Sequence, residues 1–295
     1  MALWLAPSAN RHYEDWEDFA ALMLELHRQY GFRFFKIDNI RLKTKAAEDN
    51  LEQLLRRART ASDGGIYFNL DATNGMRPGY FMFLEYGNIF LENRYVCHNW
   101  GVGYHPEHTL RNFWQLASYV RAQALQIEIP DPGSIDYEFY RRKKLAPPDV
   151  YPPDYWAAIA MFANPLLWLA PSRLQPRHAA IFRRIIACHR QYRQEIFAGE
   201  IFPLGSRPGS GELTGFQSHQ FAADRGFIIV YRELQAPAAA TLHLRYLHPH
   251  HIYRYRELAP ATLPDDRTTE HTGNLFPVTL PAPGSWQMFR YDPVT

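Results

Sequence analysis

Residues 15–38 decide the fold that the sequence predicts, and they read DWEDFAALMLELHRQYGFRFFKID. Apolar residues recur at helical spacing from Trp16 onward, and Gly31 is of the type that commonly ends a helix. Residues 32–37 form a short stretch that is rich in aromatic and apolar side chains, which predicts a strand. The polar Asp38 stands where that strand ends. A helix followed by a strand in this way is typical of the repeating units of a parallel β/α sheet.

The same alternation extends in both directions from this unit. Strands are expected at residues 3–6, 65–70, 89–91, 125–129 and 165–169, and helices at residues 45–61, 108–120, 154–162 and 176–197. About six strands result, whereas a closed barrel of β/α units needs eight. Residues 1–198 are therefore interpreted as a (β/α)8 barrel domain that lacks about its first two β/α units. An open doubly wound sheet, which would need no missing strands, is the alternative.

The pattern of the sequence changes after residue 198, from alternating helices and strands to loops and alternating polar and apolar residues. Residues 205–211 are rich in Gly and Ser and predict a loop. Residues 226–231, 241–246 and 252–255 alternate in the manner of antiparallel strands. Residues 199–295 are therefore expected to form a small antiparallel, β-sandwich-like C-terminal domain.

Composition excludes several classes of function. The 295 residues include 32 basic and 30 acidic side chains, for a formal net charge of +2, so a nucleic-acid partner is not expected. No stretch of about 18 apolar residues is present, which argues against a membrane span. The two cysteines, Cys97 and Cys188, are too few for a disulfide framework and identify no cellular compartment.

Polar side chains gather where the expected strands end, which is where parallel β/α folds carry their reactive groups. These side chains are Lys36, Asp38, Asn69, Asp71, Glu92, Asn93, Arg94 and Glu128. Several carboxylates among aromatic residues suit glycosidic bond cleavage, which uses one carboxylate as nucleophile or base and another as acid. Structural roles compete with this reading: Asp38 could cap a helix, Asp71 could brace a turn, and Glu92 could pair with an arginine.

Three motifs resemble those of glycoside hydrolase family 36, the melibiase-like α-galactosidases. Residues 34–39, FFKIDN, resemble the family's Lys-Trp-Asp signature at the end of its fourth strand, in which the Asp is the nucleophile. Residues 69–79, NLDATNGMRPG, look like its next strand end, a Gly-rich turn followed by Arg. Residues 89–95, IFLENRY, fall where the family carries Trp-(Thr/Ser)-Asp, and residues 3–7, LWLAP, are similar to its preceding strand.

The resemblance implies a glycosidase that cleaves α-linked galactoside-type sugars by a retaining, two-carboxylate mechanism without a cofactor. Its substrate would be an oligosaccharide or glycoside. By this likeness Asp38 is the nucleophile and Glu92 the acid/base, and the substrate is bound by Trp4, Lys36, Asp71, Arg77 and Arg94. The sequence departs from the family pattern at two places: Asp71 stands where the family has Cys, and Glu92 or Asn93 where it has the acid/base Asp.

The likeness also implies that the chain begins near the third strand of the barrel, so that its natural partner is a preceding segment of the same enzyme. An unclosed sheet would expose the edge strand at residues 3–6, and we therefore expect the isolated chain to be poorly soluble or marginally folded. The alternative function is a catalytically inactive carbohydrate-binding or scaffold fragment of such an enzyme.

Two further readings are weaker. Soft and borderline metal ligands lie close together from Cys97 and His98 to His105 and His108, and these residue types suit a zinc site, although no helical His-Glu-x-x-His pattern supports it. An α/β esterase is disfavoured because the sequence has no Gly-x-Ser-x-Gly motif.

Overall fold

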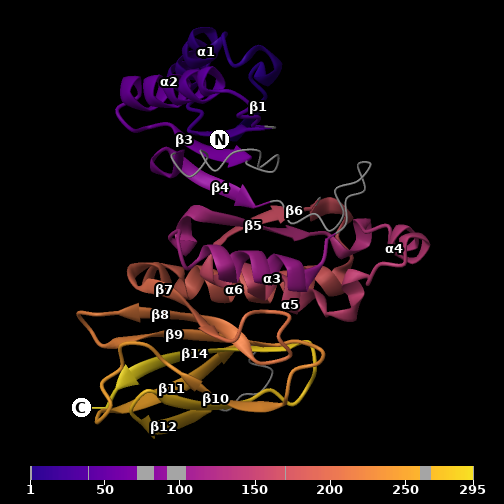
Figure 1. The fold of residues 1–295 in the computed structure, drawn as a ribbon, viewed down its shortest axis with the longest axis vertical. Helices are drawn as coiled ribbons and strands as arrows, with labels where there is room; N and C mark the ends of the chain where they lie inside the picture. Colours follow the sequence, from indigo (N-terminus) through magenta and orange to yellow (C-terminus); the bar gives the residue numbers. More distant parts are fainter. Residues whose placement is uncertain are drawn as a thin grey trace. The chain divides into compact units, whose positions relative to one another are not determined.

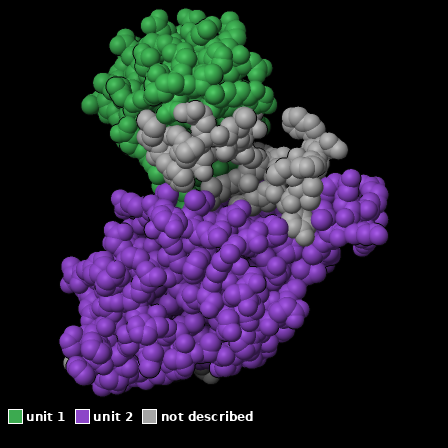
Figure 2. Space-filling view, viewed as in Figure 1, with its two compact units in different colours: residues 1–92, 124–126 green, residues 93–123, 127–295 purple. Residues whose placement is uncertain are grey.

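The computed structural model describes residues 2–38, 40–71, 83–91, 104–169, 171–259 and 267–294. The chain divides into two compact units, shown in different colours in Figure 2. Unit 1 comprises residues 1–92 and 124–126, and unit 2 comprises residues 93–123 and 127–295.

Unit 1 consists of parallel strands and two long helices. Its elements are β1 (Ala2–Leu5), α1 (Trp16–Tyr30), β2 (Phe34–Ile37), α2 (Lys45–Ala61), β3 (Tyr67–Asp71) and β4 (Gly87–Leu91). Strand β1 pairs with β2, β2 with β3 and β3 with β4, in each case in parallel. Helices α1 and α2 lie side by side against these strands (Figure 1).

The core of unit 1 lies between this helical pair and one face of the sheet. Phe35, Ile37 and Leu70 point from the strands into it and are fully or almost fully buried. Helix α2 contributes its apolar face, with Leu51 and Leu55 both fully buried. These contacts explain why the helical and strand periodicities in the sequence predict this part of the fold, because both patterns bury residues in the same core.

Helix ends follow local sequence signals. Thr44 caps the start of α2, and its side-chain oxygen accepts a hydrogen bond from the backbone N–H of Ala47 at 3.2 Å. Gly31 ends α1 with φ +70°, a left-handed conformation that glycine adopts without a steric penalty.

The first sheet has six strands in the order of the sequence, β1-β2-β3-β4-β5-β6, with β5 at Leu125–Pro130 and β6 at Asn164–Trp168. Six strands in sequence order, connected in part by helices, agree with the prediction of a partial barrel. The described residues do not show a closed (β/α)8 barrel.

The helices of unit 2 come before its antiparallel strands. They are α3 (Pro106–Leu116), α4 (Tyr137–Lys143), α5 (Pro153–Ile159) and α6 (Pro176–Ala198). Short 3-10 helices lie at Ala9–Arg11, Ala122–Ala124, Pro132–Ser134, Pro148–Val150, Ala160–Phe162 and Pro171–Arg173, the first of them in unit 1. Within the part of the chain that the structure describes, no helix combines the length and the apolar character needed to cross a membrane.

The antiparallel strands of unit 2 form a second six-stranded sheet and a separate two-stranded ribbon. The strands are β7 (Glu200–Gly205), β8 (Thr214–Gln220), β9 (Arg225–Arg232), β10 (Ala239–His243), β11 (Ile252–Ala259), β12 (Thr268–Thr272), β13 (Leu275–Thr279) and β14 (Ser285–Pro293). The large sheet has the order β12-β11-β14-β9-β8-β7, and β10 pairs with β13. Buried side chains of both sheets, including Val230, Leu242 and Phe276, share one core, which agrees with the prediction of antiparallel sheets in this part of the chain.

The β strands of unit 2 also pack on its helices. The rings of Phe113 in α3 and Phe216 in β8 have centroids 4.1 Å apart, and the Trp114 indole donates to the backbone oxygen of Leu204 at 3.3 Å. The Tyr231 hydroxyl of β9 donates to the backbone oxygen of Ala158 at 2.7 Å. These contacts join the helices of unit 2 to its antiparallel sheet, and the compact units do not divide at residue 198. The domain boundary at residue 198 stays a prediction from the sequence.

Gly87 permits the close pairing of β3 and β4. A Cβ atom at this position would lie 2.0 Å from the backbone oxygen of Phe68, which cannot move without breaking the strand pair. We expect Gly87→Ala to lower the free energy of unfolding by about 2 kcal/mol or more, measured by urea denaturation of the full chain. Gly133→Ala is the control, because the atoms nearest to its added Cβ belong to side chains, those of Asp131 at 3.3 Å and Gln175 at 3.9 Å. Equal stability of the two variants would contradict the assignment.

His189 gives unit 2 a stability that depends on pH. Its imidazole is buried in α6, and its Nε2 has no hydrogen-bond partner among the described residues. Burial, with a smaller contribution from Arg193, lowers its pKa to about 4. Below pH 6.5 the unfolded chain binds a proton at this residue that the folded chain does not, so stability falls as the pH drops from about 6.5 to 4.

We expect His189→Leu to remove this contribution, up to about 1.4 kcal/mol per pH unit, from the slope of unfolding free energy against pH. Urea denaturation at several pH values between 4 and 7 measures the slope. His243→Leu, at an exposed position, is the control. A slope that is the same in the wild type and in His189→Leu would show that the folded chain protonates His189 as readily as the unfolded chain.

Candidate active site

The face of the sheet opposite to the helices of unit 1 carries the polar side chains. Because side chains alternate along a strand, the residues between the buried ones point to this second face. The register places Trp4 beside Lys36, Lys36 beside Asn69, and Asn69 beside Asn88. One row of ring, ammonium and amide groups therefore crosses four neighbouring strands.

Lys36 joins the two carboxylates that follow this row. Its Nζ lies 3.5 Å from an Asp38 carboxylate oxygen and 3.6 Å from an Asp71 carboxylate oxygen. The side chains of Lys36 and Asp71 are 15% and 8% exposed, and that of Asp38 is 26% exposed. A partly buried cation between two carboxylates offsets their mutual repulsion, and it leaves Asp38 as the more accessible of the two.

Two aromatic rings flank the same ammonium group. Lys36 Nζ lies 4.8 Å from the centre of the Trp4 ring and 4.5 Å from that of the Phe90 ring. Both distances are within the range of cation–π attraction, which contributes about 0.5 to 2 kcal/mol. The Trp4 ring is nevertheless 56% exposed.

Backbone hydrogen bonds extend the sheet to the residues that carry the acids. The backbone N–H of Asp38 donates to the Leu5 oxygen at 3.0 Å, and that of Ile40 donates to the Asp71 oxygen at 3.3 Å. Asp38 is therefore held at the strand end by the sheet itself. It does not cap a helix, since the side-chain cap of α2 is Thr44.

Of the predicted site residues, the structure brings together Trp4, Lys36, Asp38 and Asp71. Glu92, Arg77 and Arg94 lie outside the described residues, and so do Asn93, Cys97 and His98. The pairing of Asp38 with Glu92 stays a prediction. Among the described residues, no group of three His, Cys, Asp or Glu side chains could hold a metal ion.

Glu128, the other candidate acid, lies in β5 and is half-buried. The pKa of Tyr104 is raised, chiefly by burial and in smaller part by the nearby Glu128 carboxylate. Glu128 has contacts of its own, so its position at a strand end does not by itself give it a chemical role.

Two residues of β4 beside the site were missed from the sequence: Asn88, which belongs to the polar row, and the apolar Phe90, whose ring flanks Lys36. In the sequence they stand four and two positions before Glu92. This even spacing is the signal that could have identified them, because alternate residues of a strand share one face. An amide hydrogen bond between Asn69 and Gln126 was also missed, because it joins β3 to a strand more than fifty residues later.

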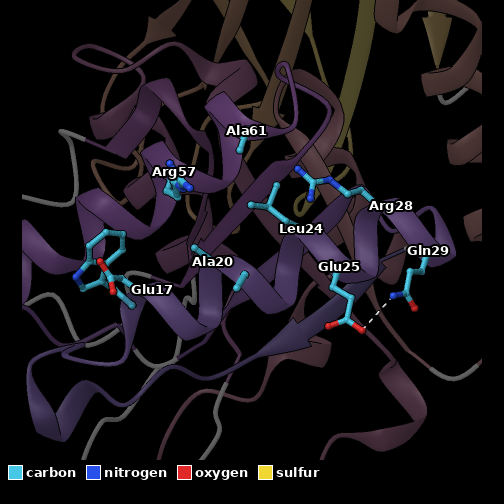
Figure 3. A pocket seen from close by; sticks show the side chains of 10 residues that line it. Glu17, Ala20, Leu24, Glu25, Arg28, Gln29, Arg57 and Ala61 are labelled. Atoms are coloured by element: carbon cyan, nitrogen blue, oxygen red, sulfur yellow. Dashed lines mark hydrogen bonds between the residues drawn. The ribbon is translucent and has the colours of Figure 1, made fainter.

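A groove of about 800 Å³ lies elsewhere in unit 1, along α1 and α2 (Figure 3). Ala20 and Leu24 of α1 line it together with Arg57 and Ala61 of α2, and Glu25 accepts a hydrogen bond from Gln29 along its side. None of the strand-end residues lines this groove, so it is separate from the candidate site.

Comparison with known proteins gives no match by sequence, either to a model of a protein family or to a curated protein. Solved structures do match. An alpha-galactosidase from Lactobacillus brevis has a TM-score of 0.66 at 14% identity, over 96% of this chain and 38% of that one. A GH36 alpha-galactosidase from Geobacillus stearothermophilus in complex with 1-deoxygalactonojirimycin has a TM-score of 0.67 at 13% identity, over 96% and 39%.

The chain has the fold of a segment of the GH36 alpha-galactosidases. The resemblance seen in the sequence motifs is thereby confirmed for the fold. The chain spans less than two fifths of the length of these enzymes. Pullulanase type I from Bacillus subtilis, complexed with maltose, matches with a TM-score of 0.55 at 11% identity, over 98% of this chain and 49% of that one.

The position of Lys36 between two acids predicts a stability effect. We expect Lys36→Met to lower the free energy of unfolding at pH 7 by about 1 to 3 kcal/mol, because it leaves two neighbouring carboxylates without their shared cation. Urea denaturation at pH 7 measures it.

Lys45→Met is the matched control for this variant. Lys45 also contacts two acids, Glu48 and Asp49, but its side chain is 64% exposed, and exposed ion pairs contribute little. If Lys36→Met were no more destabilising than Lys45→Met, the buried ion pairs would not support the site.

Proposed function

We propose that this chain carries the nucleophile side of a retaining glycoside hydrolase site that acts on α-linked galactosides. The observation that carries the proposal is the placement of Asp38: an accessible carboxylate at a strand end, beside Lys36 and an exposed Trp4 ring. The fold similarity to alpha-galactosidases supports the choice of sugar.

In the proposed reaction a carboxylate oxygen of Asp38 attacks the anomeric carbon, and the bond from that carbon to the leaving oxygen breaks. Glu92 donates a proton to the leaving oxygen. In the second step Glu92 takes a proton from water, the water oxygen attacks the same carbon, and Asp38 is released with overall retention of configuration. No cofactor takes part in either step.

The remaining side chains bind and orient the sugar. The ammonium of Lys36 donates to sugar hydroxyl groups and Asp71 accepts from them, while the exposed Trp4 ring stacks on the sugar. Arg77 and Arg94 are proposed as further donors to hydroxyl groups.

The proposal predicts that Asp38→Ala removes turnover of nitrophenyl α-galactoside by at least about a thousandfold, and that azide restores release of nitrophenol by forming a glycosyl azide. Asp49→Ala, at an exposed acid of α2, is the control and should keep full activity. Asp38→Ala that kept more than about a tenth of the activity, a barrier change under 1.4 kcal/mol, would refute the role of Asp38.

A second candidate function is carbohydrate binding without turnover, and the short span of the chain relative to the alpha-galactosidases favours keeping it. Calorimetric titration with 1-deoxygalactonojirimycin separates the two. Binding that is lost in Asp38→Ala, without hydrolysis of any α-galactoside, supports the non-catalytic function. Absence of both binding and hydrolysis contradicts both proposals.

A further inference from the structure

The β strands of unit 2 carry an exposed aromatic surface that the proposed reaction does not use. We call it the aromatic platform and define it by Phe202, Phe221, Arg245 and Tyr246. The Tyr246 ring centroid lies 5.2 Å from that of Phe202 and 5.1 Å from that of Phe221. Phe221 is 56% and Tyr246 59% exposed, so two large rings of one cluster face solvent together.

The backbone at this surface adopts conformations that cost free energy. Tyr246 has φ +65°, and Asp224, in the turn between β8 and β9, has φ +46°. The left-handed conformation costs a non-glycine residue about 1 kcal/mol, and such residues occur preferentially at binding sites. The sequence predicted a strand over residues 241–246, whereas β10 ends at His243 and the chain turns so that the Tyr246 ring is exposed.

A buried glutamine holds this turn in place. The fully buried side chain of Gln217 accepts a hydrogen bond from the Arg245 backbone N–H at 2.8 Å and donates to the Arg245 backbone oxygen at 2.9 Å. Gln217 also donates to the Tyr291 hydroxyl at 3.0 Å. These hydrogen bonds hold the backbone of the platform in one conformation, which reduces the conformational entropy that would be lost on ligand binding.

His219 lies under the two exposed rings. Its imidazole is buried, with its ring centroid 5.0 Å from Phe221 and 6.3 Å from Tyr246. Its Nδ1 lies 2.9 Å from the Tyr291 hydroxyl. Exposed rings supported by a buried polar network are a built surface, in contrast to single exposed apolar side chains.

Charged groups flank the rings. The Arg245 guanidinium lies 5.8 Å from the centre of the Phe202 ring. Asp224 is 31% exposed and accepts a hydrogen bond from the Tyr253 hydroxyl at 2.7 Å. A donor and an acceptor therefore lie near the aromatic surface, a combination that matches hydroxyl groups, because hydroxyl groups both accept and donate.

We propose that the aromatic platform is a second carbohydrate-binding site, which takes one sugar ring of a neutral oligosaccharide. The apolar C–H face of the sugar would lie on Tyr246 and Phe221, with its hydroxyl groups toward Arg245 and Asp224. Two exposed rings suit one sugar ring, whereas a stable protein interface buries about 800 Å² on each partner. The inference does not depend on Asp38 or on hydrolysis.

Affinity electrophoresis of the full chain through gels that contain soluble galactomannan or soluble starch tests this inference. Tyr246→Gly is the decisive variant, because glycine removes the ring and also relieves the left-handed strain, which offsets part of the stability lost with the ring contacts. Each lost ring should weaken retention by roughly twofold to tenfold. Phe221→Ala is the second variant, and Tyr119→Ala, at a residue that is 87% exposed outside the platform, is the control.

Retention of the wild type in either gel, weakened in Tyr246→Gly and Phe221→Ala but kept in Tyr119→Ala, would support the platform. Retention lost only in Trp4→Ala would place all sugar binding at the candidate active site and overturn the inference. Absence of wild-type retention in both gels would also overturn it. If the wild type were not retained but self-associated in sedimentation experiments, and Tyr246→Gly abolished that self-association, the platform would be a protein interface and not a sugar site.

Discussion

The ion pairs of Lys36 are the interaction on which the candidate site depends. Asp38 and Asp71 end neighbouring strands on one face of the sheet, and two carboxylates so close to each other and partly withdrawn from water would repel each other. The ammonium between them offsets this repulsion. Strand pairing in turn fixes the lysine, because Lys36 occupies the middle of a row that spans β1 to β4.

The two faces of this sheet have different roles. One face is apolar and packs on α1 and α2, which supplies the free energy that holds the strands in register. The other face is thereby free to carry ammonium, amide and carboxylate groups whose mutual arrangement would be costly in a core. Close approach of the strands at Gly87 helps to keep these groups in line.

Sequence predicts best what local patterns determine. Helix α2 has the expected bounds, and α1 ends at the expected glycine, because apolar spacing and capping residues act within a few positions. All six strands of the parallel sheet were predicted for the same reason. Strands β7, β8 and β12 to β14 were missed, since antiparallel strands with mixed polarity are defined by partners distant in sequence.

The same distinction separates the site residues. Lys36 and Asp38 follow directly from their place after one apolar strand. The contact of Lys36 with Trp4 and Phe90 depends on register across three strand pairs, which no single stretch encodes. The Tyr246 turn was read as strand because its residues alternate, although Gln217, nearly thirty residues earlier, determines its conformation.

The packing of Phe113 on Phe216 and of Tyr231 on Ala158 makes helices α3 and α5 part of the support of the antiparallel sheet. A polypeptide cut after Ala198 would leave the ring of Phe113 without its partner, and the strands beyond the cut would lose the surface that covers Phe216. Exchange of the C-terminal sheet between related chains therefore has to carry the preceding helices with it. The smallest segment that can be inherited as a unit begins upstream of the first antiparallel strand.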